Sequence, residues 1–91
     1  MESIKGVIKI TKLSDINGYD QIYYFTGIIV NNDGHININY SGNVWEAMKF
    51  NWNSSNNAEV FKIQSLITFI ENCLLPKKKF KVEISFLNLT Y

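Results

Sequence analysis

The 91-residue chain contains no arginine, one cysteine, one proline and one histidine. A single cysteine cannot form an intramolecular disulfide, and one cysteine with one histidine cannot supply a metal site built from several such ligands. The absence of arginine weakens any case for bidentate contacts with phosphate or guanine. We therefore expect no disulfide, no metal and no cofactor.

Motifs of membrane insertion and of catalysis are missing as well. No apolar run approaches the roughly 20 residues that a membrane-spanning helix needs, and Met1-Glu2-Ser3 does not begin a signal peptide. The sequence has no glycine-rich phosphate loop and no nucleophile elbow, and its carboxylates are scattered. We expect a cytoplasmic protein that is not an enzyme and does not contact a membrane.

The residues that are abundant suit one small domain spanning 1–91. Hydrophobic residues make up 46% of the chain and include six Phe, five Tyr and two Trp, which is enough to fill a core. The net charge is +1, and every cation is a lysine. Lysine, isoleucine and asparagine are the residues with the most AT-rich codons, so their abundance indicates an AT-rich genome or a mobile element.

The longest apolar run, Gln21 to Val30, predicts a strand that is apolar on both faces and lies at the centre of a sheet. The turn sequence Asn31-Asn32-Asp33-Gly34 follows it, and the segment from Ile36 to Tyr40 then alternates apolar and polar residues. We expect a β-hairpin with His35 exposed at its tip.

Two registers fit this hairpin. A three-residue loop with glycine in the left-handed region pairs Ile38 with Ile28, whereas a two-residue Asp33-Gly34 loop pairs Ile38 with Ile29. We favour the three-residue loop, which places Tyr24 on the core face of the sheet. The opposite face then carries four side chains: Tyr23, Phe25, Asn37 and Asn39.

Three more segments have strand patterns. The segments from Ile4 to Leu13 and from Lys77 to Phe86 alternate apolar and polar residues, and a change of phase after Phe86 indicates a bulge or a new partner strand. The segment from Val44 to Trp52 predicts a fourth strand, with a short helix over Val44 to Phe50 as the alternative.

One helix is expected from about residue 57 to about residue 75. Asn56 and Glu59 match a capping box, and Pro76 ends the helix. Its apolar stripe belongs against a sheet and contains five residues at helical spacing: Val60, Ile63, Ile67, Ile70 and Leu74. Cys73 is expected to be buried and inert.

The element order strand, strand, strand, strand, helix, strand predicts an α+β fold. We expect a single antiparallel sheet of about four or five strands with the helix packed on one face. An OB barrel is the alternative, and it requires the last segment to divide into two strands.

Lysines and aromatic residues offer two candidate surfaces. If the terminal strands are neighbours, Lys5, Lys9, Lys79 and Lys81 form one basic patch, although lysines also protect sheet edges. Aromatic side chains exceed the needs of the core, and such side chains anchor protein interfaces or stack on unpaired bases. The candidate partner-binding residues are Tyr23, Phe25, His35, Asn37, Asn39 and Trp45.

These observations favour a small non-enzymatic module that binds another protein, as an inhibitor of the toxin-immunity or phage anti-defence type. The segment Val30-Asn31-Asn32-Asp33-Gly34 is similar to the hairpin tip of a small anti-CRISPR inhibitor. That inhibitor is strongly acidic and this chain is not, so we assign no family. The alternative function is binding of single-stranded nucleic acid, and a monomer and a homodimer both remain open.

Overall fold

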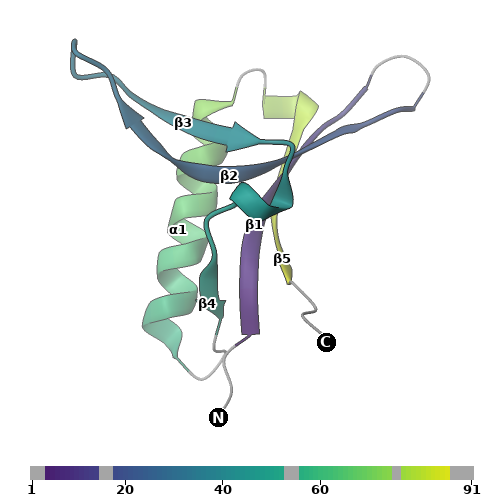
Figure 1. The fold of residues 1–91 in the computed structure, drawn as a ribbon. Helices are drawn as coiled ribbons and strands as arrows, with labels where there is room; N and C mark the ends of the chain where they lie inside the picture. The colour runs from purple at the N-terminus through teal and green to yellow at the C-terminus, as the bar shows by residue number, and fades with distance from the viewer. Residues whose placement is uncertain (1–3, 15–17, 53–55, 75–76, 87–91) are drawn as a thin grey trace.

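The structure is a computed structural model that describes residues 4–14, 18–52, 56–74 and 77–86. One antiparallel sheet and a single α-helix, α1 (Asn57–Cys73), make up the described chain, which confirms the expected α+β fold (Figure 1). The remaining elements are the strands β1 (Ile4–Lys12), β2 (Gln21–Val30), β3 (Ile36–Ser41), β4 (Phe50–Trp52) and β5 (Phe80–Phe86), and the 3-10 turns η1 (Val44–Glu46) and η2 (Lys77–Lys79).

The central strand of the sheet is β1. One edge of β1 pairs with β5 from Gly6 to Lys12. Its other edge is shared, because β4 pairs with β1 at Ile4–Gly6 and β2 pairs with it at Lys9–Lys12. The prediction that β2 is the centre of the sheet is therefore wrong. Only the first part of β2 lies against β1, and the rest leaves the sheet with β3 as its partner.

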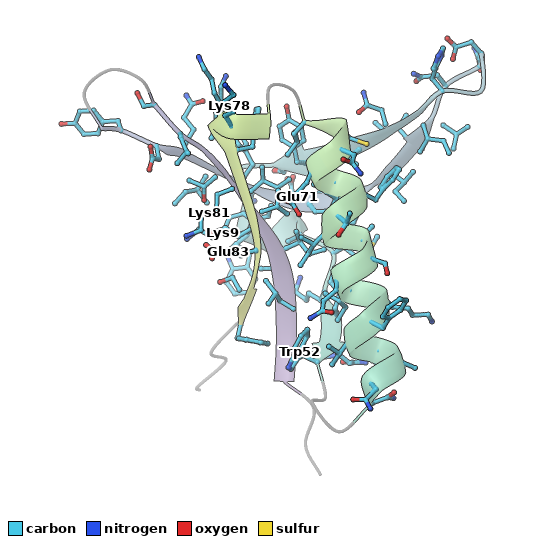
Figure 2. The ribbon with its side chains drawn as sticks, turned by 180° about the vertical axis from the view of Figure 1, so that it is seen from behind. Lys9, Trp52, Glu71, Lys78, Lys81 and Glu83 are labelled. Carbon is cyan, nitrogen blue, oxygen red and sulfur yellow. The ribbon has the colours of Figure 1, made fainter. Side chains whose placement is uncertain are left out.

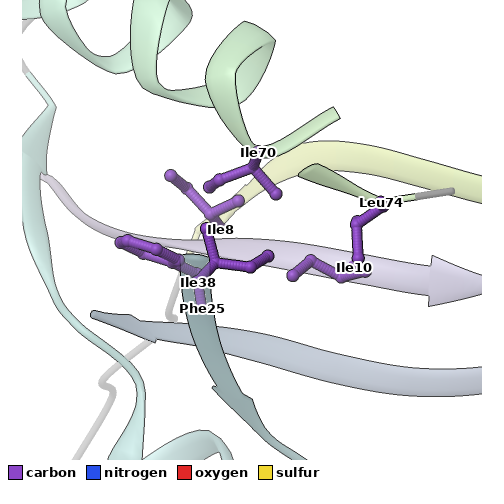
Figure 3. Packing of buried hydrophobic residues seen from close by; sticks show 6 residues of the cluster. All are labelled: Ile8, Ile10, Phe25, Ile38, Ile70 and Leu74. Atoms are coloured by element: carbon purple, nitrogen blue, oxygen red, sulfur yellow. The ribbon is translucent and has the colours of Figure 1, made fainter. Parts of the chain in front are cut away.

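The core lies between the sheet and α1. The packed cluster takes side chains from four elements, as Figure 3 shows: Ile8, Ile10, Phe25, Ile38, Ile70 and Leu74. Full burial of an aliphatic or aromatic side chain contributes about 1.5–3 kcal/mol, so a cluster of this size is the main stabilising element of so short a chain. The predicted apolar stripe of α1 provides the helix side of this core.

Helix α1 begins as its sequence predicts. The Asn56 side chain accepts a hydrogen bond from the Glu59 backbone N–H at 3.3 Å, which satisfies one of the free donors of the first turn. The helix ends at Cys73, and the Leu74 N–H still donates to the Ile70 carbonyl at 3.2 Å. Among the described residues, no helix has both the length and the apolar character needed to cross a membrane.

The segment from Val44 to Trp52 combines both predictions made for it. Its first part is the turn η1, capped by the Asn43 side chain, which accepts from the Trp45 N–H at 3.0 Å. Its last part is the short strand β4. The predicted change of phase after Phe86 lies outside the described residues.

Gly6 of β1 leaves space for the side chains of Ile84 and Phe86 of β5. It pairs with Phe50 on one side and with Phe86 on the other. A Cβ atom at Gly6 would lie 3.0 Å from Cδ1 of Ile84, which is closer than ordinary van der Waals contact. Trp52 and Phe86 meet edge to face across β1, with ring centroids 5.7 Å apart.

Candidate functional site

The tip of the β2–β3 hairpin is the predicted three-residue loop. The Asn31 N–H donates to the His35 carbonyl at 2.8 Å, and the Gly34 N–H donates to the Asn31 carbonyl at 2.9 Å. Gly34 has a φ of 86°, in the left-handed region that glycine adopts without strain. Ile28 therefore pairs with Ile38, as predicted.

A β-bulge at Thr26 changes which residues of β2 face α1. The register shifts between Phe25 and Gly27, so Thr26 is an extra residue in β2. An insertion of one residue moves the following side chains to the other face. As a result Phe25 is only 1% exposed, and Tyr23, opposite buried Ile10, packs against the core beside it.

The predicted faces of this strand are therefore wrong. Tyr24 lies opposite Lys9, on the face away from α1, while Tyr23 and Phe25 lie on the core face. The cause is the bulge, because the alternation of the sequence was read without it. The bulge also leaves the Thr26 hydroxyl buried without a hydrogen-bond partner among the described residues, at a cost of about 1–3 kcal/mol.

Beyond the bulge the hairpin projects from the fold. We call residues 27–39 the arm; in Figure 1 it extends past α1 to the loop that joins β2 and β3. Ile38 is the last arm side chain in the core. The four aliphatic side chains beyond the core contact are exposed: Ile28 by 51%, Ile29 by 42%, Val30 by 67% and Ile36 by 55%.

The arm lies in a stretch of sequence with almost no charge. Between Asp20 and Glu46 the only residue with a formal charge at pH 7 is Asp33, and no lysine occurs between Lys12 and Lys49. Exposed surface of a small protein usually carries interspersed charges, whereas the centre of a protein interface is depleted of them. The arm shares this low content of charge with interface centres.

The single carboxylate of the arm is held by its neighbour. One Asp33 oxygen lies 2.7 Å from His35 Nδ1, and the other accepts from the His35 N–H at 3.1 Å. These bonds from His35 lower the pKa of Asp33 below its ordinary value. The tip is thereby closed by a local contact between Asp33 and His35 that needs no other element of the fold.

The structure brings together only part of the predicted partner-binding set. His35, Asn37 and Asn39 are exposed on the arm. Tyr23 is half-buried and meets Tyr40 edge to face, with centroids 5.2 Å apart. The two others lie off the arm: Phe25 is in the core, and Trp45 is 71% exposed on η1.

The exposure of the aliphatic residues of the arm was not predicted. The sequence places Ile28, Val30 and Ile36 on the core face of the sheet. It places Ile29 on the opposite face, in a strand that is expected to be central because it is apolar on both sides. The absence of charge from Gln21 to Trp45, apart from the tip, is a signal that could have identified them. A long hairpin with a single charged residue lacks the charged face that a solvent-exposed strand usually has.

The four predicted basic residues do not form a uniform patch. Lys9 lies directly opposite Glu83, and Lys81 Nζ lies 3.8 Å from a Glu83 carboxylate oxygen (Figure 2). Lys5 is farther along β1 and donates to the Asn51 side chain of β4. Lys79 belongs to η2. A carboxylate therefore sits between the two closest lysines.

Two hollows accompany these surfaces. One lies between β4 and α1, and the other borders β3, where its lining comprises Asn37, Ile38, Asn39, Tyr40, Cys73, Leu74 and Phe80. Cys73 itself is half-buried, not fully enclosed. In the part of the chain that the structure describes, no three His, Cys, Asp or Glu side chains are grouped as a metal ion would require.

Comparison with known protein families, with curated proteins and with solved structures found no match to this chain.

Proposed function

We propose that this protein is a small non-enzymatic module that binds another protein through its arm. The observation that carries the proposal is the exposure of four aliphatic side chains on a projecting hairpin that has a single carboxylate. Exposed apolar groups of this kind mark interaction sites on small proteins.

The energetics of the arm support this function. Burial of a whole isoleucine or valine side chain is worth about 1.5–3 kcal/mol, so burying the half that is exposed contributes about 1 kcal/mol for each of Ile28, Ile29, Val30 and Ile36. The two strands hold these side chains in place before binding, which lowers the entropy lost on association. A narrow projecting hairpin fits a concave site on its partner.

Insertion into a concave site is the action of an occluding inhibitor. We therefore propose an inhibitor of the toxin-immunity or phage anti-defence class. The arm would cover the functional cleft of its target, and its exposed amides, Asn37 and Asn39, would provide hydrogen bonds at the rim of the apolar contact.

Binding of single-stranded nucleic acid has less support. The arm carries no lysine, and its exposed large apolar side chains are all aliphatic. The lysines that lie closest together on the sheet are separated by Glu83. A groove that follows a phosphate backbone needs a continuous positive surface.

The test compares two serine substitutions on the arm with one outside it. Ile29→Ser and Val30→Ser remove apolar contact area on opposite faces of the arm. Ile22→Ser is the matched control, because Ile22 is 44% exposed, close to the 42% of Ile29, but lies where β2 pairs with β1. Proteins captured by the wild type from cells that encode it are quantified by mass spectrometry, and the leading one is purified for calorimetry.

We expect the purified partner to bind the wild type and the control equally and the arm variants at least about tenfold more weakly, the equivalent of about 1.4 kcal/mol. Equal binding by all four proteins would contradict the proposal. So would tight binding of a labelled single-stranded oligonucleotide that weakens steeply with added salt, since that result belongs to a nucleic-acid-binding protein.

A further inference from the structure

The edges of the sheet are protected unequally. Among the described strands β5 pairs with β1 alone and contains Lys81 and Glu83, and β4 is only three residues long. Charges and shortness are two common ways of preventing strands from adding to an edge. The third edge, β3, is six residues long, contains no charged residue and no proline, and is paired on one side only among the described strands.

The second strand of the arm is protected by its bulge. Beyond Tyr24 the outer edge of β2 has no strand beside it in the described chain, but the Thr26 bulge interrupts that edge. Bulges twist an edge out of the geometry that another strand requires. No such interruption occurs within β3, so among the described strands β3 is the longest regular edge without a charged residue.

The hydrogen-bond pattern of the hairpin determines which groups of β3 are free. Asn31 and His35 form a hydrogen-bonded pair at the tip, and such pairs alternate with non-bonded ones along an antiparallel ladder. The backbone groups of Ile36, Ile38 and Tyr40 therefore point away from β2. Consistent with this, the Ile38 N–H donates at 2.8 Å to the side chain of Asn37 and not to a strand.

We propose that β3 pairs with β3 of a second copy of this chain, antiparallel and about a two-fold axis. An antiparallel pair of identical strands is self-complementary, so it forms a closed dimer. Because β3 carries no charge, the two copies meet without like-charge repulsion. A hollow of about 450 Å³ borders this edge, and Cys73, Leu74 and Phe80 line its other side.

One register uses all three residues of β3 whose backbone groups point away from β2. With Ile38 opposite Ile38 of the second copy, Ile36 lies opposite Tyr40, and all three residues of each strand exchange hydrogen bonds once the Ile38 N–H releases the Asn37 side chain. A shift by one pair in either direction leaves an end residue without a partner. The same register places Asn37 opposite Asn39 of the second copy, on the face of the sheet away from α1.

The contact is small, and its size sets the expected affinity. Stable interfaces use roughly 20–30 residues from each partner, whereas β3 has six. We therefore expect a weak dimer that forms at high micromolar concentration. The proposal goes beyond the proposed function and does not depend on it, because pairing uses the edge of β3 and leaves both faces of the two arms exposed.

The oligomeric state is measured by sedimentation velocity from low micromolar to millimolar concentration. Ile36→Lys places a charge at the edge, and Ile36→Pro removes the outward N–H at the first residue of the strand, where proline is tolerated. Phe61→Lys is the control, because Phe61 is an exposed apolar residue on α1. We expect the dimer dissociation constant to rise at least about tenfold in both Ile36 variants and to be unchanged in the control.

Cross-linking tests the register. In a background in which Cys73 is replaced by serine, Asn37→Cys and Asn39→Cys proteins are oxidised separately and as a mixture. We expect the disulfide-linked dimer mainly in the mixture. Position 37 of one copy lies opposite position 39 of the other, so a pair of facing cysteines needs one Asn37→Cys chain and one Asn39→Cys chain. A monomer at millimolar concentration, a dimer that both Ile36 variants retain, larger open-ended assemblies, or equal cross-linking in all three samples would overturn the proposal.

Discussion

The arm and the rest of the fold, which we call the body, contain the same kind of aliphatic residue. In the core of the body these residues are buried, and in the arm most of them are exposed. Ile8 in β1 is fully buried, whereas Ile28 in β2 is half-exposed. The difference is in their neighbours: β1 has strands on both edges and α1 on one face, and the outer part of β2 has only β3. An apolar strand is therefore buried only where other elements pack beside it. The sequence of the strand does not show which elements will do so.

The arm also differs from the body in what stabilises it. An isolated two-stranded hairpin is marginally stable in water. Here the hairpin is attached to the core through Phe25 and Ile38, and its tip is closed by the contact of Asp33 with His35. The arm thus keeps its shape through its two ends, while the exposed residues between them contribute little to folding.

Large-to-small substitutions give the greatest contrast between the two regions. Ile70→Ala creates a cavity in the core and should lower the free energy of unfolding by about 2–5 kcal/mol. Val30→Ala removes methyl groups from an exposed position and should change it by less than about 0.5 kcal/mol. Urea unfolding followed by circular dichroism measures both. Similar losses for the two variants would mean that the arm belongs to the core.

Glycine substitutions sharpen the same contrast at a smaller scale. A Cβ at Gly6 meets Ile84 at 3.0 and 3.2 Å, so Gly6→Ala should destabilise the protein by about 1–3 kcal/mol through overpacking. Gly27 is in the arm and has no heavy atom within 4 Å of such a Cβ, so Gly27→Ala should be neutral or stabilising by up to about 1 kcal/mol. Thermal unfolding of the two alanine variants decides between these outcomes.

The smallest expected effect concerns pH and is confined to the tip. Because His35 lowers the pKa of Asp33, the contact favours the folded hairpin at pH values above the ordinary aspartate pKa of 3.8. This contribution is lost as the pH falls through the lowered pKa, since the protonated carboxyl no longer accepts both hydrogen bonds. The contribution is therefore present at neutral pH and declines as the pH falls below 3.8.

His35→Ala removes the side-chain bond and should raise the pKa of Asp33 towards its ordinary value. Asn37→Ala, also on the arm, is the control and should leave this pKa unchanged. Carboxyl NMR titration of Asp33 measures the shift. An unchanged pKa in the His35 variant would show that the backbone N–H, which both variants retain, is the dominant partner.

Much of the fold could be predicted from the sequence because local chemistry decides it. The Asn56 cap, the stripe of α1 and the Gly34 turn are each set by residues close together in the chain, and all three are present. The bulge at Thr26 and the position of β1 at the centre depend on contacts between distant segments. No local pattern distinguishes a bulged strand from a regular one.

The candidate site was predicted only in part, for the same reason. His35, Asn37 and Asn39 were identified because turn residues and alternating polar residues reveal their own exposure. Phe25 was misplaced because the bulge reversed its face, and Val30 was missed because the hairpin projects away from the core, where β3 is the strand beside it. The exposure of the arm can be recognised only when the positions of the other strands and of α1 are known.

The Thr26 bulge has a consequence for how such a protein can change over time. It changes which face the β2 side chains take at the border of the arm, and beyond it the pairing of β2 with β3 is regular. Equal insertions of two residues in each strand would extend the arm and preserve its faces. Arms of different length and composition could therefore be exchanged at residues 27–39 without changing the faces of the strands in the body.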